Sequence, residues 1–192
     1  MTIPNLITIG RLVFVPLIVW LIIAGQPATA FWAFVIAGVS DAVDGFIARQ
    51  FNLRSDLGAY LDPLADKALL VSIYVALALL NEIPVWVTIL VVSRDLFIVG
   101  AVLLSWMLGQ PMPMRPALVS KANTLAQITL AAVALGDLAF NPDLATIRIG
   151  LHYLVGVLTV TSAALYLVDW IRHMGGGAVG APVDQAHRDR LR

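Results

Sequence analysis

Four aspartates lie close together in a chain that is otherwise apolar. Asp41 and Asp44 are three residues apart, and Asp62 and Asp66 are four apart. Either spacing places both carboxylates of a pair on one face of a helix. Carboxylate oxygens suit hard cations such as Mg²⁺ or Mn²⁺, and two divalent ions would balance four negative charges. Because two-metal sites of this kind serve phosphoryl transfer, the spacing predicts a catalytic metal site.

A purely structural role for the same aspartates is the alternative. They could form salt bridges between helices with Arg49, Arg54 and Lys67, or lie in the lipid headgroup layer. Insertion scales assign about 2.5–3.5 kcal/mol to each aspartate at mid-membrane, and clustered anions also repel one another. Gly45 and Gly58 flank the two pairs, and small residues let helices approach closely. We therefore favour one metal-binding volume between two adjacent helices.

The elements that position these carboxylates are predicted to be membrane helices. The 192 residues are 60% hydrophobic and 12% charged, and the mean hydropathy is +0.89. About 20 apolar residues cross a hydrocarbon core, and a spanning segment must satisfy its own backbone hydrogen bonds. The chain is thus expected to be an all-α integral membrane protein with six transmembrane helices, at residues 4–25, 29–50, 57–80, 84–108, 118–138 and 144–172.

Cations set the expected orientation, because they are enriched on the cytosolic side of membranes. An even number of spans with both termini cytosolic places nine cations at the inner surface: Arg11, Arg49, Arg54, Arg115, Lys121, Arg172, Arg188, Arg190 and Arg192. The four aspartates then lie at the cytosolic end of the second and third helices. Residues 1–174 form one membrane domain, and the tail at 175–192, rich in glycine and charge, is expected to be disordered and cytosolic.

Three features of the sequence bear on alternative topologies and alternative metal sites. Cleavage of the first span as a signal peptide would leave five spans, but its leading segment is polar rather than basic. The chain has no cysteine, which excludes disulfides and thiol metal ligands. The three histidines (His152, His173 and His187) have no metal-ligand spacing.

The carboxylate pattern resembles a known signature in every position. That pattern is Asp41-x-x-Asp44-Gly45-x-x-Ala48-Arg49, eight further residues, then Gly58-x-x-x-Asp62-x-x-x-Asp66. It is similar to the signature of the CDP-alcohol phosphatidyltransferase family. The resemblance extends from "TIPNLITIGRL" to "SKANTLAQ". It implies a six-helix membrane enzyme, usually a homodimer, whose site opens to the cytosolic leaflet.

The resemblance also implies roles for individual residues. In this family a CDP-linked lipid donates its phosphatidyl group to an alcohol, and CMP leaves. Asp41, Asp44, Asp62 and Asp66 would hold two divalent cations, with Asp66 also acting as general base. The CDP-lipid donor would be bound by Asn5, Thr8, Gly45, Arg49, Ser55 and Gly58. For Asn5 and Thr8, a helix cap and a headgroup contact are the alternative roles.

The sequence indicates the acceptor alcohol less clearly than it indicates the donor. An ionisable pair in mid-membrane, Arg94 and Asp95, is a functional candidate, although it could be a self-neutralising structural pair. Arg115 and Lys121 are the other candidates for acceptor binding, and Lys121 could instead extend toward the membrane surface.

Two branches of the family compete for the acceptor. "IPNLITIGR" and "LDPLADK" resemble phosphatidylglycerophosphate synthases, which use glycerol 3-phosphate. That branch usually has Arg-Glu in the fourth helix and Gly-Lys-x-Lys-Thr in the fifth, whereas this chain has Asp95 and Asn123. "DGFIAR", "LDPLADKALL", "VVSRDLFIVGAV" and "SKANTLAQ" resemble the mitochondrial-type cardiolipin synthases, whose acceptor is phosphatidylglycerol. We favour that branch, since a single phosphodiester charge needs fewer cations.

The expected partners are thus CDP-diacylglycerol, phosphatidylglycerol, the lipid bilayer and a second copy of the chain, and no nucleic acid. Without an N-terminal targeting extension, the expected location is a bacterial cytoplasmic (inner) membrane. A cation transporter is the non-enzymatic alternative. Transporters usually place such sites near the midplane between inverted repeats, whereas these aspartates cluster at one end of two spans.

Overall fold

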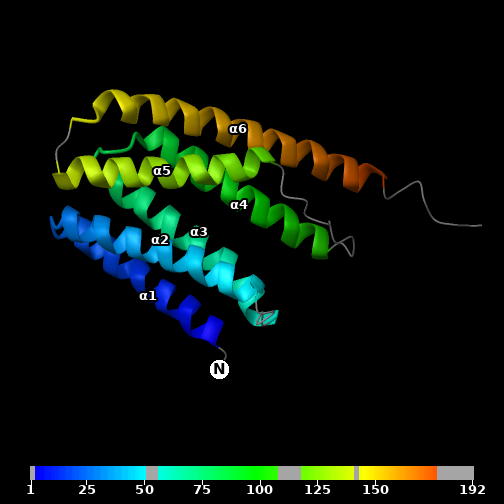
Figure 1. Ribbon diagram of the computed structural model, residues 1–192. Helices are drawn as coiled ribbons and strands as arrows, with labels where there is room; N and C mark the ends of the chain where they lie inside the picture. Colours follow the sequence, from blue (N-terminus) through cyan, green and yellow to red (C-terminus); the bar gives the residue numbers. More distant parts are fainter. Residues whose placement is uncertain (1–2, 51–55, 108–117, 141–142, 177–192) are drawn as a thin grey trace, which may run out of the picture.

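The structure is a computed structural model that describes residues 3–50, 56–107, 118–140 and 143–176. For residues 3–12, 41–50, 56–66, 102, 103, 106 and 173–176 it describes the backbone alone. Within these ranges the chain forms six α-helices (Figure 1): α1 (Ile3–Ile23), α2 (Pro27–Gln50), α3 (Asp56–Leu79), α4 (Val85–Met107), α5 (Leu118–Phe140) and α6 (Ala145–Gly176).

The helices fall where the apolar segments predict them, with boundaries that differ by a few residues. The largest difference is at α6, which continues to Gly176. Two residues of the expected tail are therefore helical. The remainder of that tail lies outside the described residues.

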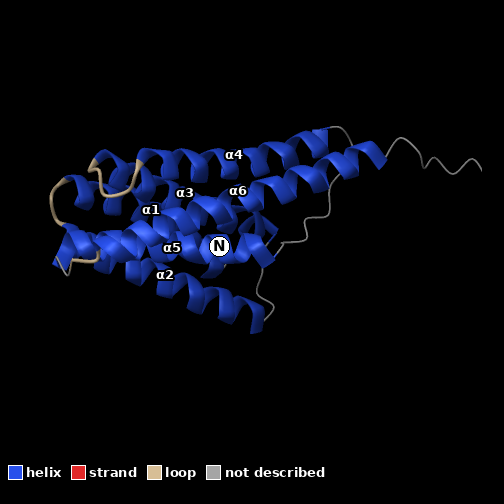
Figure 2. Cartoon of the chain, turned by 90° about the horizontal axis from the view of Figure 1, so that it is seen from above, coloured by secondary structure: helices blue, strands red, loops and turns tan. Residues whose placement is uncertain are grey.

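The helices form a closed ring with a central contact. Going around the ring, α1 packs against α2, α2 against α5, α5 against α6, α6 against α4, α4 against α3, and α3 against α1. A further contact between α3 and α5 crosses the middle. Seen from above, α2 and α4 lie on opposite flanks of the bundle (Figure 2). This arrangement gives the molecule two separate sides, one formed by α2 and the other by α4 and α6.

Two of the turns are determined by local sequence. Gly25 follows α1 with a φ of 70°, and Gln26 donates its backbone N–H to the Leu21 carbonyl at 2.9 Å. After α3, Asn81 has a φ of 61°, and Glu82 donates to the Leu77 carbonyl at 2.9 Å. Both are Schellman caps, in which glycine or asparagine adopts the left-handed conformation. They reverse the chain at the end of the bundle opposite the chain's start (Figure 1).

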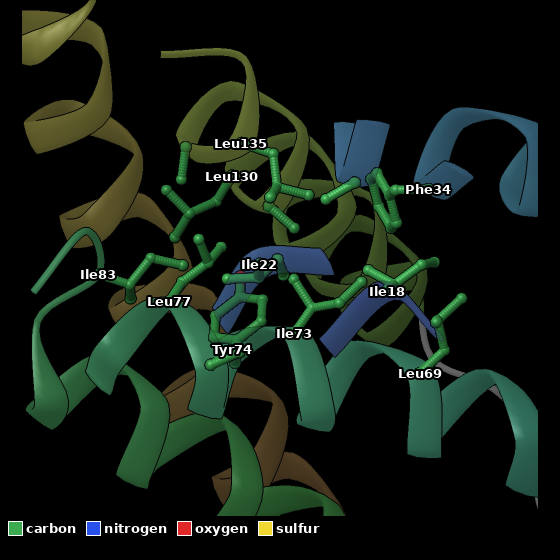
Figure 3. Close-up of a cluster of buried hydrophobic side chains, with 14 of the residues drawn as sticks. Ile18, Ile22, Phe34, Leu69, Ile73, Tyr74, Leu77, Ile83, Leu130 and Leu135 are labelled. Carbon is green, nitrogen blue, oxygen red and sulfur yellow. The ribbon is translucent and has the colours of Figure 1, made fainter. Parts of the chain in front are cut away.

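The buried apolar core lies where the central helices meet (Figure 3). Ile73, Tyr74 and Leu77 of α3 face Leu130 and Leu135 of α5, and all five side chains are fully buried. Further side chains come from the surrounding helices, including Ile18, Ile22, Phe34, Val87, Val91 and Val155. The core therefore holds α3 and α5 as the rigid centre of the ring.

The distribution of side chains fits a membrane environment. Large apolar side chains such as Trp20, Leu96 and Val157 are exposed on the outer surface, whereas polar side chains such as Asn123 and Gln127 are buried inside. Among the described residues, two helical segments are long and apolar enough to cross a bilayer, Leu118–Phe140 and Ala145–Arg172. Shorter apolar segments lie at Val13–Ile23, Pro27–Ser40 and Lys67–Leu79.

Candidate active site

The signature aspartates occupy two helices, α2 and α3, that are consecutive in the chain. Asp41 and Asp44 lie in the last half of α2, and Asp62 and Asp66 lie in the first half of α3. The end of α2 and the start of α3 lie at the same end of the bundle as the start of α1 (Figure 1). The structure therefore places the two pairs on different helices that reach the same end of the bundle, and their meeting in one site stays a prediction.

The side chains of the four aspartates lie outside the described part of the structure, so their grouping around a metal stays a prediction. The same holds for Gly45, Arg49 and Gly58 in α2 and α3, and for Asn5 and Thr8 in α1. Ser55 and Arg115 fall wholly outside the described residues. Among the side chains that are described, no three histidine or carboxylate groups come together as a metal site.

A buried ion-pair network begins one residue after the last signature aspartate. Lys67 of α3 donates to Asp95 Oδ1 of α4 at 2.5 Å. Arg94 donates from Nη1 to the same oxygen at 2.7 Å. Arg94 and Asp95 are only 4% and 6% exposed. The expected Arg94–Asp95 pair therefore forms, and the added Lys67 contact joins it to the helix that carries Asp66.

Arg94 extends this network to the remaining two helices of its side of the ring. Its Nη2 donates to Ser120 Oγ of α5 at 2.6 Å and to Ser162 Oγ of α6 at 2.8 Å. Its guanidinium carbon lies 5.7 Å from the centre of the Tyr166 ring, within cation–π distance. We call Lys67, Arg94, Asp95, Ser120 and Ser162 the Arg94 network. It joins α3, α4, α5 and α6 through one guanidinium and one carboxylate.

Further polar groups continue from the Arg94 network into the bundle. Thr159 Oγ1 donates to Asn123 Oδ1 at 2.9 Å, and the Tyr74 hydroxyl donates to the Gln127 carbonyl at 3.0 Å. Several buried atoms have no hydrogen-bond partner among the described residues, namely Arg94 Nε, Asp95 Oδ2, Asn123 Nδ2, Gln127 Nε2, Gln127 Oε1 and His152 Nε2. Since buried polar groups are nearly always satisfied, this interior suits water or the polar part of a ligand.

Lys121 differs from the buried members of the predicted acceptor set. Its side chain is exposed near the start of α5, one residue after Ser120. The sequence suggested Lys67 only as a salt-bridge partner of the signature aspartates, whereas the structure pairs it with Asp95. Ser120 and Ser162 were not predicted, because nothing in the sequence marks a serine in an apolar helix as an arginine partner.

A cavity of about 420 Å³ lies between α4 and α6, with Arg94 in its wall. Most of its lining is apolar, and the lining residues are Leu90, Ser93, Arg94, Phe97, Thr159, Val160, Ala163, Ala164 and Leu167. We call this cavity the α4–α6 groove. It connects the buried Arg94 network with the outer surface of the bundle.

A second set of ion pairs closes the opposite end of the bundle. Arg148 near the start of α6 donates to Glu82 in the α3–α4 turn and lies 3.4 Å from Asp137 Oδ2 of α5. The Leu144 backbone N–H also donates to Asp137 at 3.1 Å. These contacts fasten turns far from the signature, so we assign them to stability.

Comparison with known proteins identifies the family. The family model described as CDP-alcohol phosphatidyltransferase matches residues 1–167, which include the whole signature and the Arg94 network. The chain belongs to the CDP-alcohol phosphatidyltransferase family. The resemblance that the signature carries is therefore confirmed.

Curated relatives fall in both branches of this family. The human cardiolipin synthase (CMP-forming) is 37% identical over 156 residues, which are 73% of this chain and 52% of that protein. The cardiolipin synthase (CMP-forming)/mitochondrial hydrolase fusion protein of Schizosaccharomyces pombe is 34% identical over 182 residues, 87% of this chain and 31% of that protein. The chain thus spans about half or less of these two relatives.

The other branch is also represented. The CDP-diacylglycerol–glycerol-3-phosphate 3-phosphatidyltransferase of Shigella flexneri is 34% identical over 175 residues, which are 86% of this chain and 92% of that protein. Similarity alone therefore does not separate the two acceptors.

Proposed function

We propose that this chain transfers a phosphatidyl group from CDP-diacylglycerol to phosphatidylglycerol, giving cardiolipin and CMP. The observation that carries the proposal is the family signature at the adjoining ends of α2 and α3. The human and Schizosaccharomyces pombe relatives, which are cardiolipin synthases by name, support this choice of acceptor.

The donor is held, in this proposal, by the ends of α1, α2 and α3. Asp41, Asp44, Asp62 and Asp66 fit divalent cations, since all four supply hard oxygen ligands at helical spacings. Bound Mg²⁺ or Mn²⁺ would brace the pyrophosphate and stabilise the charge on the leaving CMP. The remaining donor contacts come from Asn5, Thr8, Gly45, Arg49, Ser55 and Gly58.

Asp66 acts as the general base. It accepts the proton of a phosphatidylglycerol hydroxyl while that oxygen attacks the phosphorus that carries diacylglycerol. The new P–O bond forms as the bond from phosphorus to CMP breaks, and CMP departs with the electron pair. Lys67 follows Asp66 on α3 and is held by Asp95, so the Arg94 network fixes this part of α3 against α4.

The acceptor is bound on the other side of the signature, by Arg94, Asp95, Arg115 and Lys121. Arg94 and Asp95 are buried and already paired. Their side chains are therefore held in place before the acceptor binds. Lys121 is exposed near the start of α5 and suits the phosphodiester of the acceptor. We further propose six transmembrane spans, cytosolic termini, a homodimer and a bacterial cytoplasmic membrane.

Phosphatidylglycerophosphate synthesis from glycerol 3-phosphate is the second candidate. It is favoured by the Shigella flexneri relative, which the chain covers almost completely. Asn123 argues against it, because this position is fully buried and hydrogen-bonded to Thr159. It adds no cation for a dianionic acceptor.

A competition assay distinguishes the two candidates. Purified protein is given CDP-diacylglycerol with phosphatidylglycerol and glycerol 3-phosphate at equal concentrations, and the products are identified by mass spectrometry. We expect cardiolipin. Phosphatidylglycerophosphate without cardiolipin would assign the chain to the other branch and leave the donor and metal site intact.

A further inference from the structure

The α4–α6 groove is bounded by two places where α4 and α6 touch. At one end, Trp86 of α4 packs so closely that a Cβ added to Gly156 would lie 2.8 Å from Trp86 Cζ3. At the other end, Trp170 Nε1 donates to Ser105 Oγ at 3.0 Å. Between these contacts Arg94 also joins the two helices through Ser162, and α6 lines the groove with the small side chains of Ala163 and Ala164.

The walls of the groove match an acyl chain. Its rim includes Phe97, Val160 and Leu167, which are 41%, 53% and 39% exposed. The groove therefore opens on the apolar outer surface that is expected to face lipid. On α6 its lining runs from Thr159 to Leu167, which is about 12 Å at the helical rise of about 1.5 Å per residue.

One polar group in the groove wall lacks a partner. Arg94 is nine-tenths buried, and its Nε donates to no described residue, whereas its Nη1 donates to Asp95, a carboxylate that Lys67 also contacts. Arg94 thus brings to the groove wall a buried donor atom that has no partner among the described residues. An ester carbonyl at the head of an acyl chain has the complementary chemistry, because it is a hydrogen-bond acceptor attached to an apolar tail.

We propose that the α4–α6 groove holds an acyl chain of the phosphatidylglycerol acceptor, with its ester carbonyl accepting a hydrogen bond from Arg94. This inference rests on the proposed function and adds the route by which a lipid acceptor reaches Asp66. The acceptor is favoured over the donor because the groove lies on the α4 flank, opposite α2 (Figure 2). The two substrates of an in-line transfer enter from different sides.

The first test fills the groove with a larger side chain and compares acceptors with long and short acyl chains. Ala164→Trp should raise the KM for long-chain phosphatidylglycerol about tenfold, as expected when about two methylene groups lose their apolar contact. The KM for dihexanoyl phosphatidylglycerol and for CDP-diacylglycerol should stay within about twofold. Leu165→Trp is the matched control, since Leu165 is exposed on the same helix and does not line the groove. Equal effects on long-chain and short-chain acceptors would overturn the proposal.

The second test is independent of turnover. Phosphatidylglycerol with a photoreactive diazirine in one acyl chain should label residues 90–97 and 159–167, and Ala164→Trp should abolish this labelling. Labelling of these segments by a CDP-diacylglycerol probe alone, or by neither probe, would overturn the proposal. So would a disulfide-linked dimer of Ala164→Cys in the cysteine-free chain, because a second copy would then cover the groove.

The two proposals fail in different ways. A protein that makes cardiolipin without labelling in the groove would refute the groove alone. A protein that makes no cardiolipin would refute the proposed function, whatever the probe labels.

Discussion

Replacing Asp66 is expected to lower turnover while leaving binding of the CDP-diacylglycerol donor largely intact. Asp66→Asn keeps the shape of the side chain but cannot accept the acceptor's proton, so we expect turnover to fall by at least about 10²-fold. Binding of CDP-diacylglycerol, measured by equilibrium titration in detergent, should be largely retained. Near-normal turnover would remove Asp66 from the role of general base.

Asp41 should behave differently, because it is proposed as a metal ligand and not as the base. Asp41→Asn removes one negative oxygen from the shared site, so metal affinity and donor affinity should fall together. Calorimetric titration with Mn²⁺, with and without the donor lipid, measures both. Unchanged metal affinity would contradict the assignment.

At the same scale, Asp95 is the residue on which the Arg94 network depends. Asp95→Ala leaves Arg94 buried without its carboxylate, and losing one partner of a buried ion pair typically destabilises by about 3–5 kcal/mol. The free energy of unfolding can be measured by denaturation in detergent. Asp169→Ala is the control, because Asp169 is exposed on α6, and it should change stability by less than about 0.5 kcal/mol. Equal losses in the two variants would show that the network contributes nothing.

At the scale of elements, the contact between α4 and α6 depends on Gly156. A Cβ there would lie 2.8 Å from Trp86 Cζ3 and 3.1 Å from Cη2, so Gly156→Ala should push the helices apart and destabilise by about 1–3 kcal/mol. Gly150 is the matched control on the same helix, with no atom within 4 Å of an added Cβ.

The control variant, Gly150→Ala, has its own predicted effect on stability. Gly150→Ala should stabilise α6 by up to about 1 kcal/mol, because alanine is the better helix former. A double variant, Gly156→Ala with Trp86→Leu, should recover part of the lost stability. If both glycine variants shift the thermal midpoint upward, the close contact is not a constraint on the fold.

The sequence predicts the helices themselves better than it predicts the contacts between them. The six helices and the location of both aspartate pairs follow from apolar length and spacing, because membranes impose strong local rules on a chain. The contact between Lys67 and Asp95 could not be predicted, since it joins residues 28 apart and depends on how α3 packs against α4. The α4–α6 groove could not be predicted either, because it depends on how α4 packs against α6 and on the small size of Ala163 and Ala164.

At the scale of the whole molecule, the ring of helices would give each proposed substrate its own side. α2 carries Asp41 and Asp44 on one flank, and α4 and α6 carry the groove on the other (Figure 2), while α3 carries Asp62 and Asp66 between α1 and α4. The Arg94 network lies between them and joins four helices. A bimolecular transfer within a membrane needs such separation, because two lipids must reach one phosphorus from different directions.

The central claim is that the four signature aspartates act through divalent cations in phosphatidyl transfer. The most direct measurement is CMP release from CDP-diacylglycerol by purified protein, in the presence of phosphatidylglycerol, before and after exhaustive chelation. We predict that chelation abolishes CMP release and cardiolipin formation together, and that added Mg²⁺ or Mn²⁺ restores both. Full turnover in the chelated protein would contradict the account.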